Sequence, residues 1–147
     1  SYRRSAQITE PMEKLMTQGR LSEDDLRAKQ RFLSLGSCGG VKVYTRLNQM
    51  FLGHVDILAT IGSGLAGINN PYNKNFFEVI ASSPSTITWK DMTRNLAFIF
   101  EGGHGRDYLQ PGSLPAILHK MLDEEKKRAN DRSSRQNIMS SIEDPTG

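Results

Sequence analysis

Glycine, proline and asparagine residues divide this sequence into segments too short for long elements of secondary structure. Breaks of this kind fall at Gly19, 36–40, 69–73 and 102–105. Between them, apolar residues recur at intervals of three and four, the spacing of one face of an α-helix. The pattern predicts an all-α fold, a compact bundle of about five or six short helices packed at mixed angles.

Capping signals support the predicted helix starts. Ser22 precedes three acidic residues and can cap a helix that we expect to reach Gly36, and Thr88 stands three residues before another acid. Behind Thr88, Leu96 and Phe100 lie four residues apart on one apolar stripe. We therefore expect Leu96 and Phe100 to be in the core.

Residues 54–61 fit two patterns. Their apolar residues alternate as in a strand, but Val55, Leu58 and Ile61 also follow the spacing of a helix. Since every other segment indicates helix, a lone strand would lack a partner, and we favour a helix here. The sequence Asn69-Asn70-Pro71 is expected to break the chain between two helices.

Polarity divides the chain into three parts. Residues 1–8 form a basic arm, residues 9–122 the helical domain, and residues 123–147 a charged extension that can continue the last helix. We expect one apolar stripe of that last helix to face the core: Ile117, Leu118, Met121 and Leu122. From 123 to 137 the only apolar residue is Ala129, so this stretch must face water or another molecule.

Three apolar residues then interrupt the polar extension at helical spacing: Ile138, Met139 and Ile142. Exposed apolar residues with this spacing are typical of a short helical anchor for a partner. We expect them to bind another protein or a second copy of the chain. Folding back onto their own domain is an equal alternative.

Basic residues gather in the arm and in the extension, and the net charge of +3 permits an acidic partner. The candidates for contacts to nucleic-acid phosphates are Arg3, Arg4, Lys126, Lys127, Arg128, Arg132 and Arg135. Acids are interleaved with them, and the extension has no aromatic residue for stacking on bases. A solvated helix face explains the extension about as well.

Two glycine-rich stretches resemble enzyme motifs. Residues 62–67 match the GxGxxG of dinucleotide-binding sites, but no acid follows about twenty residues on and the expected break at 69–71 would end the helix. Residues 36–40 resemble the GxCGG nucleophile loop of chymotrypsin-like viral cysteine proteases. In those enzymes a histidine precedes the cysteine, whereas all three histidines of this chain follow Cys38.

The order of Cys38 and His54 is that of papain-like hydrolases, but a separation of sixteen residues leaves no room for the intervening strand. We therefore interpret both glycine-rich stretches as tight loops and Cys38 as a structural thiol. His104, Arg106 and Asp107 could bind phosphate, but a solvated loop is the stronger interpretation.

We predict no catalytic residues, no cofactor and no metal site. The single cysteine favours a cytoplasmic or other reducing intracellular compartment, and charge within the apolar stretch 50–68 argues against a membrane span. The leading hypothesis is a non-enzymatic interaction protein, a component of a larger assembly that binds partners through its charged arm and extension. A nucleic-acid-binding protein is the alternative, and a small-molecule or cysteine-dependent enzyme is third.

Overall fold

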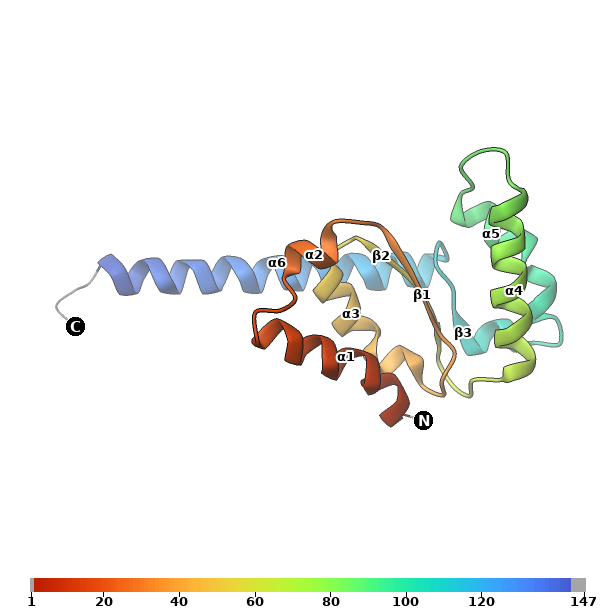
Figure 1. Ribbon diagram of the computed structural model, residues 1–147, viewed down its shortest axis with the longest axis horizontal. Helices are drawn as coiled ribbons and strands as arrows, with labels where there is room; N and C mark the ends of the chain where they lie inside the picture. The colour runs from red at the N-terminus through yellow and green to blue at the C-terminus, as the bar shows by residue number, and fades with distance from the viewer. Residues whose placement is uncertain (1, 144–147) are drawn as a thin grey trace.

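The structure, a computed structural model, describes residues 2–143, with side chains from Gln7 onward (Figure 1). Its helices and strands follow one another in this order: α1 (Tyr2–Thr17), α2 (Glu23–Arg27), β1 (Arg31–Leu35), the 3₁₀ turn η1 (Gly40–Val43), α3 (Tyr44–Phe51), β2 (Val55–Thr60), α4 (Ala66–Ser82), α5 (Trp89–Asn95), η2 (Ala97–Phe100), η3 (His104–Asp107), β3 (Tyr108–Leu109) and α6 (Leu114–Glu143).

A three-stranded mixed sheet lies at the centre, so the expectation of an all-α bundle is wrong. The strand order is β1-β2-β3, with β1 parallel to β2 and β3 antiparallel to it. The register pairs Arg31 with Val55 and Leu35 with Ala59. Residues 54–61, for which we favoured a helix, contain β2 because β1 supplies the partner that a lone strand would lack.

The helix expected from Ser22 to Gly36 ends at Arg27, although its start is confirmed by a capping box between Ser22 and Asp25. The guanidinium of Arg31 donates hydrogen bonds to the carbonyl oxygens of Leu26 (2.5 Å) and Lys29 (3.1 Å). The bond to Leu26 satisfies a carbonyl that the ending helix leaves without a partner. The chain is thereby free to turn into β1.

The sequence Asn69-Asn70-Pro71 does not break the chain, because it lies inside α4. The Asn69 side-chain amide donates to the carbonyl of Gly36 (2.8 Å) and accepts a hydrogen bond from the Tyr108 hydroxyl (3.0 Å). Tertiary contacts therefore hold the first turns of α4 in place against the local preference of the sequence.

Both faces of the sheet are covered, and β2 supplies side chains to two cores. Val55, Ile57 and Ala59 belong to a cluster with α3 and α1, whereas Leu58 belongs to a cluster with α4, α5 and η2. In Figure 1 the two groups of helices lie on either side of the strands. Leu96 (0% exposed) and Phe100 (8% exposed) are buried in the second cluster, as predicted.

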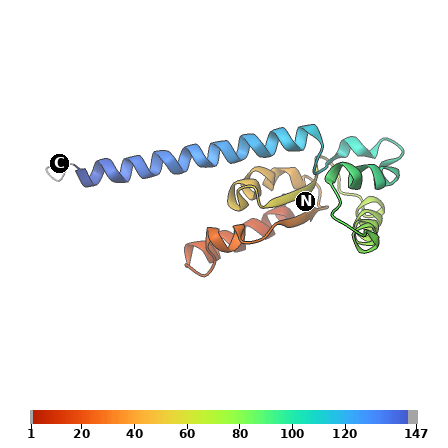
Figure 2. The same ribbon diagram turned by 90° about the horizontal axis from the view of Figure 1, so that it is seen from above.

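Helix α6 is 30 residues long. It packs against α3 and then extends past the rest of the protein, as Figures 1 and 2 show. All of its residues from 132 to 143 are exposed. Among the described residues, no helix has both the length and the apolar character needed to cross a membrane.

We predict that Leu96→Ala lowers the free energy of unfolding by about 2–5 kcal/mol, because it removes a fully buried side chain and leaves a cavity. Phe98→Ala is the matched control, because Phe98 is 54% exposed only two residues away. Denaturant unfolding of both variants measures the difference. Equal midpoints for the two variants would contradict this assignment of the core.

Candidate functional site

Between Leu114 and Asp123, helix α6 has an unusual distribution of side chains: small or polar residues face the domain, and the large apolar residues are exposed to solvent. Ala116 (2% exposed) and Asp123 (3% exposed) lie on the inward face. The exposed apolar residues are Leu114 (68%), Ile117 (43%), Leu118 (51%), Met121 (62%) and Leu122 (64%). The expectation that the stripe from Ile117 to Leu122 faces the core is therefore wrong.

Buried polar contacts explain why α6 has this orientation. Asp123 Oδ2 accepts a hydrogen bond from the side-chain amide of Asn48 on α3 (3.1 Å) and lies 2.8 Å from His119 Nδ1. Lys120 Nζ donates to the carbonyl of Val55 in β2 (2.7 Å). Because these polar groups find partners only on the inward side, the opposite side of the helix is left to the apolar residues.

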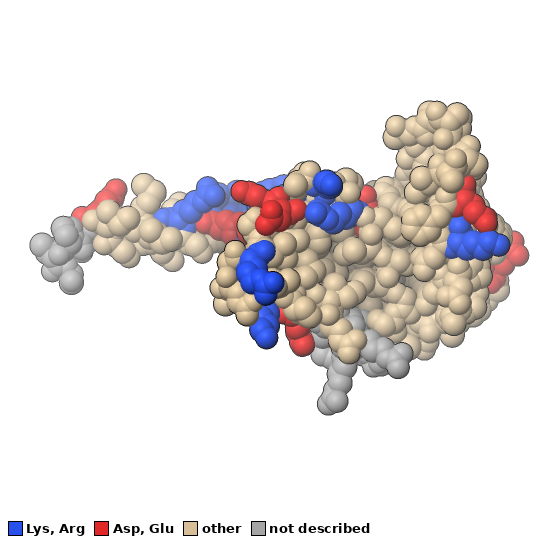
Figure 3. Space-filling view, in the orientation of Figure 1, with Lys and Arg blue, Asp and Glu red and all other residues tan. Residues whose placement is uncertain are grey.

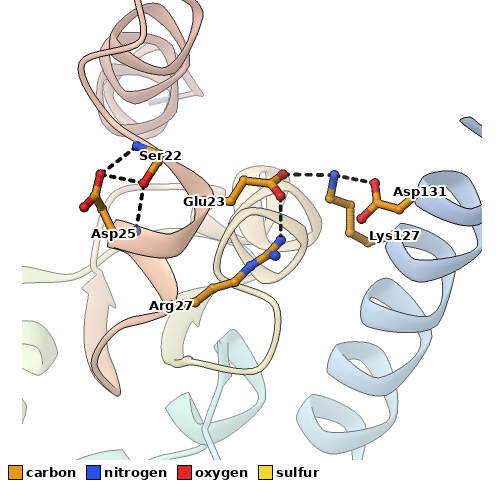
Figure 4. A network of polar contacts seen from close by, with 6 residues as sticks. All are labelled: Ser22, Glu23, Asp25, Arg27, Lys127 and Asp131. Atoms are coloured by element: carbon orange, nitrogen blue, oxygen red, sulfur yellow. Dashed lines mark hydrogen bonds and ion pairs between the residues drawn. The ribbon is translucent and has the colours of Figure 1, made fainter. Parts of the chain in front are cut away.

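A further ion-pair network ties α6 to α2 (Figure 4). Lys127 Nζ lies 2.9 Å from Asp131 Oδ1 and 3.2 Å from Glu23 Oε1, and Glu23 also pairs with Arg27 (3.3 Å). The hydrogen bond to Asp131 is the main cause that raises the pKa of Lys127 above its ordinary value. The ammonium group of Lys127 is thus occupied by acids of its own chain.

Other basic residues proposed for phosphate contacts also have acidic neighbours. Arg128 lies 3.8 Å from Glu124, and Arg132 lies 3.3 Å from Glu125. Figure 3 shows blue and red side chains next to one another over α2 and α6. The structure therefore does not gather these residues into a basic patch free of acids.

The remaining basic candidates are spread apart. Lys126 and Arg135 have no ion pair with another described residue. Arg3 and Arg4 lie in the first turn of α1, and their side chains are outside the described part of the structure. That turn lies away from the projecting part of α6 in Figures 1 and 2.

Ile138 (61% exposed), Met139 (60%) and Ile142 (72%) lie on the part of α6 that extends past the domain. The helix carries them away from the core rather than back onto it (Figure 2). These three residues and the five exposed apolar residues from Leu114 to Leu122 form two groups, separated by the polar stretch 123–137, and we call the two groups together the α6 apolar face. From the sequence alone we assigned the first group to the core, because its spacing is that of an ordinary core stripe, and only the second group to a binding surface.

The two glycine-rich stretches meet at the carboxyl ends of β1 and β2, a contact that the sequence analysis missed. The backbone N–H of Gly39 donates to the carbonyl of Gly62 (2.8 Å), and the N–H of Gly64 donates to the exposed thiol of Cys38 (3.3 Å). Parallel pairing of the two strands brings the loops together. The sequence could have predicted this contact only if the pairing of β1 with β2 had been known.

Residues 62–67 follow strand β2 and end in the first two residues of helix α4, as in a dinucleotide-binding motif, so the sequence argument from a broken helix does not hold. Close contact between the loops nevertheless accounts for one of the three glycines in this stretch. A Cβ on Gly64 would lie 1.8 Å from the carbonyl oxygen of Gly36. Ligands often bind at the carboxyl edge of parallel strands, but here the loops pack against each other.

The other titratable side chains in the described part of the chain do not form a recognisable centre. His104 Nδ1 lies 3.7 Å from Asp107 Oδ2, and both side chains are more than 40% exposed, as expected for a solvated loop. Within residues 2–143, no three His, Cys, Asp or Glu side chains are grouped so that they could hold a metal ion.

We predict that Gly64→Ala destabilises the protein by about 1–3 kcal/mol, because the added methyl group must displace the backbone of the neighbouring loop. Gly62→Ala is the control, because a Cβ at Gly62 would meet no atom within 4 Å. Its effect should stay within about 0.5 kcal/mol. Thermal and denaturant unfolding check both values, and similar losses in the two variants would contradict the close approach.

We predict that Asp123→Ala destabilises the attachment of α6 by about 1–3 kcal/mol, because it leaves the buried amide of Asn48 without its acceptor. Glu125→Ala is the control, since the Glu125 side chain is 65% exposed. Hydrogen exchange of α6 amides and the unfolding midpoint measure the effect. An unchanged midpoint in Asp123→Ala would show that the buried contact does not hold the helix.

Comparisons with known proteins find no relative of this chain. No protein-family model, no curated protein and no solved structure matches the chain. The basis for a functional proposal is therefore the geometry of the chain itself.

Proposed function

We propose that this chain is a non-enzymatic interaction protein, a component of a larger assembly, that binds its partner through the α6 apolar face. One observation carries the proposal: a helix with a polar inward face presents eight apolar side chains to solvent. Apolar residues that are exposed together, rather than scattered singly, are typical of a protein–protein interface.

A partner that covers the α6 apolar face removes exposed apolar surface from water. Complete burial of one Leu, Ile or Met side chain stabilises an association by about 1.5–3 kcal/mol. Leu118, Met121, Met139 and Ile142 are each at least half exposed. A partner that covers them gains the part of this free energy that corresponds to the exposed fraction of each side chain.

The charges of α6 favour a protein partner over nucleic acid. Acids of the same chain pair with Lys127, Arg128 and Arg132, so a phosphate would have to displace them. A reducing compartment such as the cytoplasm would suit the exposed thiol of Cys38, because exposed thiols oxidise elsewhere.

We predict that the quadruple variant Leu118→Ser, Met121→Ser, Met139→Ser and Ile142→Ser keeps its cooperative melt but loses binding. The four side chains contribute to the interface and not to the core, so the free energy of unfolding should change by no more than about 1 kcal/mol. The tagged full chain, expressed in its native source, is used to capture partners, and mass spectrometry quantifies them.

The control variant is Phe77→Ser with Phe98→Ser, because these residues are also exposed (66% and 54%) but lie on α4 and η2. The proposal requires that the control retain the captured partners. If the quadruple variant captures the same set as the unaltered chain, the α6 apolar face is not the binding surface.

A further inference from the structure

We infer that the occupant of the α6 apolar face is a second copy of this chain, with the two α6 helices paired antiparallel. The inference rests on the proposed function, since it names the partner for the same surface. It is carried by the spacing of the apolar residues along α6 and by the charges between them.

The α6 apolar face contains the same pattern twice. Ile117, Leu118 and Met121 are followed 21 residues later by Ile138, Met139 and Ile142. This separation equals three heptads, the repeat of helices that wind around one another. In a straight α-helix the second group is rotated by about 60° relative to the first, at about 20° per heptad, and left-handed supercoiling removes this offset.

Charged residues fill the positions between the two groups. With alternating steps of three and four residues, the resulting seam consists of Leu118, Met121, Glu125, Arg128, Arg132, Arg135, Met139 and Ile142. The ion pair between Glu125 and Arg132, seven residues apart, shows that these two positions lie on the same side of the helix. The seam is thus apolar at both ends and charged in the middle.

Antiparallel pairing matches the apolar ends of the seam. With the two-fold axis beside Asn130, Leu118 of one copy faces Ile142 of the other, and Met121 faces Met139. A large apolar side chain then meets another in four layers of the seam, two at each end.

The charged middle distinguishes antiparallel from parallel pairing. In the antiparallel pair, Glu125 of each copy faces Arg135 of the other, while Arg128 faces Arg132. Arg128 and Arg132 each have an acid of their own helix beside them. Antiparallel pairing therefore opposes like charges in two of the four charged layers. Parallel pairing would oppose like charges in all four, with Glu125 against Glu125 and each arginine against its own copy, and such contacts are unfavourable.

The shape of the protein leaves room for this pair. The domain lies on the inward face of α6, and in Figure 2 no other described element covers the opposite side. The two domains would therefore lie on opposite sides of the helix pair. The seam from Leu118 to Ile142 is about 36 Å long at 1.5 Å per residue, which is more than three heptads.

Sedimentation equilibrium of the full chain tests whether the dimer forms. The monomer mass is 16.5 kDa, and we expect twice this mass at micromolar concentrations. Glu125→Arg and Arg135→Glu should each weaken dimerisation by at least about tenfold, since each creates two like-charge contacts. The double variant, Glu125→Arg with Arg135→Glu, should recover most of this loss, because the swapped charges again face each other.

Disulfide cross-linking tests the direction of the helices, in a Cys38→Ser background. An equimolar mixture of Leu118→Cys and Ile142→Cys should give a cross-linked dimer of the two different variants. Neither variant alone should cross-link to itself. A Leu118→Cys homodimer would show parallel helices and overturn the inference.

The outcomes separate this inference from the proposed function. A chain that stays monomeric up to 100-fold above the concentration in its native source, but loses partner capture in the quadruple serine variant, overturns the dimer and leaves the proposed function standing. A monomeric chain whose captured partners do not depend on the α6 apolar face overturns both.

Discussion

The buried contact between Asp123 of α6 and Asn48 of α3 fixes how α6 is rotated about its own axis. Asp123 is 3% exposed and Asn48 1% exposed, so neither side chain has water as an alternative partner. An unpaired buried carboxylate costs far more than an exposed methyl group. The helix therefore turns its polar side inward, and the position of every other α6 side chain follows.

The additional attachments of α6 share this polar character. Lys120 binds the carbonyl of Val55, the Tyr44 hydroxyl donates to the carbonyl of Ala116 (3.3 Å), and Lys127 pairs with Glu23. Directional bonds allow only one rotation and one register of the helix. An apolar contact would tolerate several, so the polar attachment presents the α6 apolar face in one defined orientation.

The sequence predicted those features that depend on neighbouring residues. The caps at Ser22 and Thr88 and the burial of Leu96 and Phe100 follow from residues three or four positions apart. The sheet could not be predicted in this way, because β1 and β2 each form a strand only when paired with the other. Their apolar residues fit a helix equally well until the partner is known.

The candidate site was predicted only in part, for a related reason. The exposed group at Ile138 was visible because charged residues surround it in sequence. The group at Leu118 resembled a core stripe, since an apolar stripe on a helix normally faces inward. The contrary signal lay on α3, where Asn48 offers a buried partner to Asp123, and sequence spacing along α6 does not contain that information.

The glycine loops, like the inward face of α6, hold parts of the fold together. At the carboxyl edge of β1 and β2, where many sheets of this kind bind ligands, Gly64 is pressed against Gly36 and the loops bond to each other. That edge is used to join the two loops. The exposed apolar surface lies instead on α6. This helix is held to the domain by polar bonds and continues beyond it. A helix so placed can bind another helix without disturbing either core, because Leu118, Met121, Met139 and Ile142 are each at least half exposed in the isolated chain.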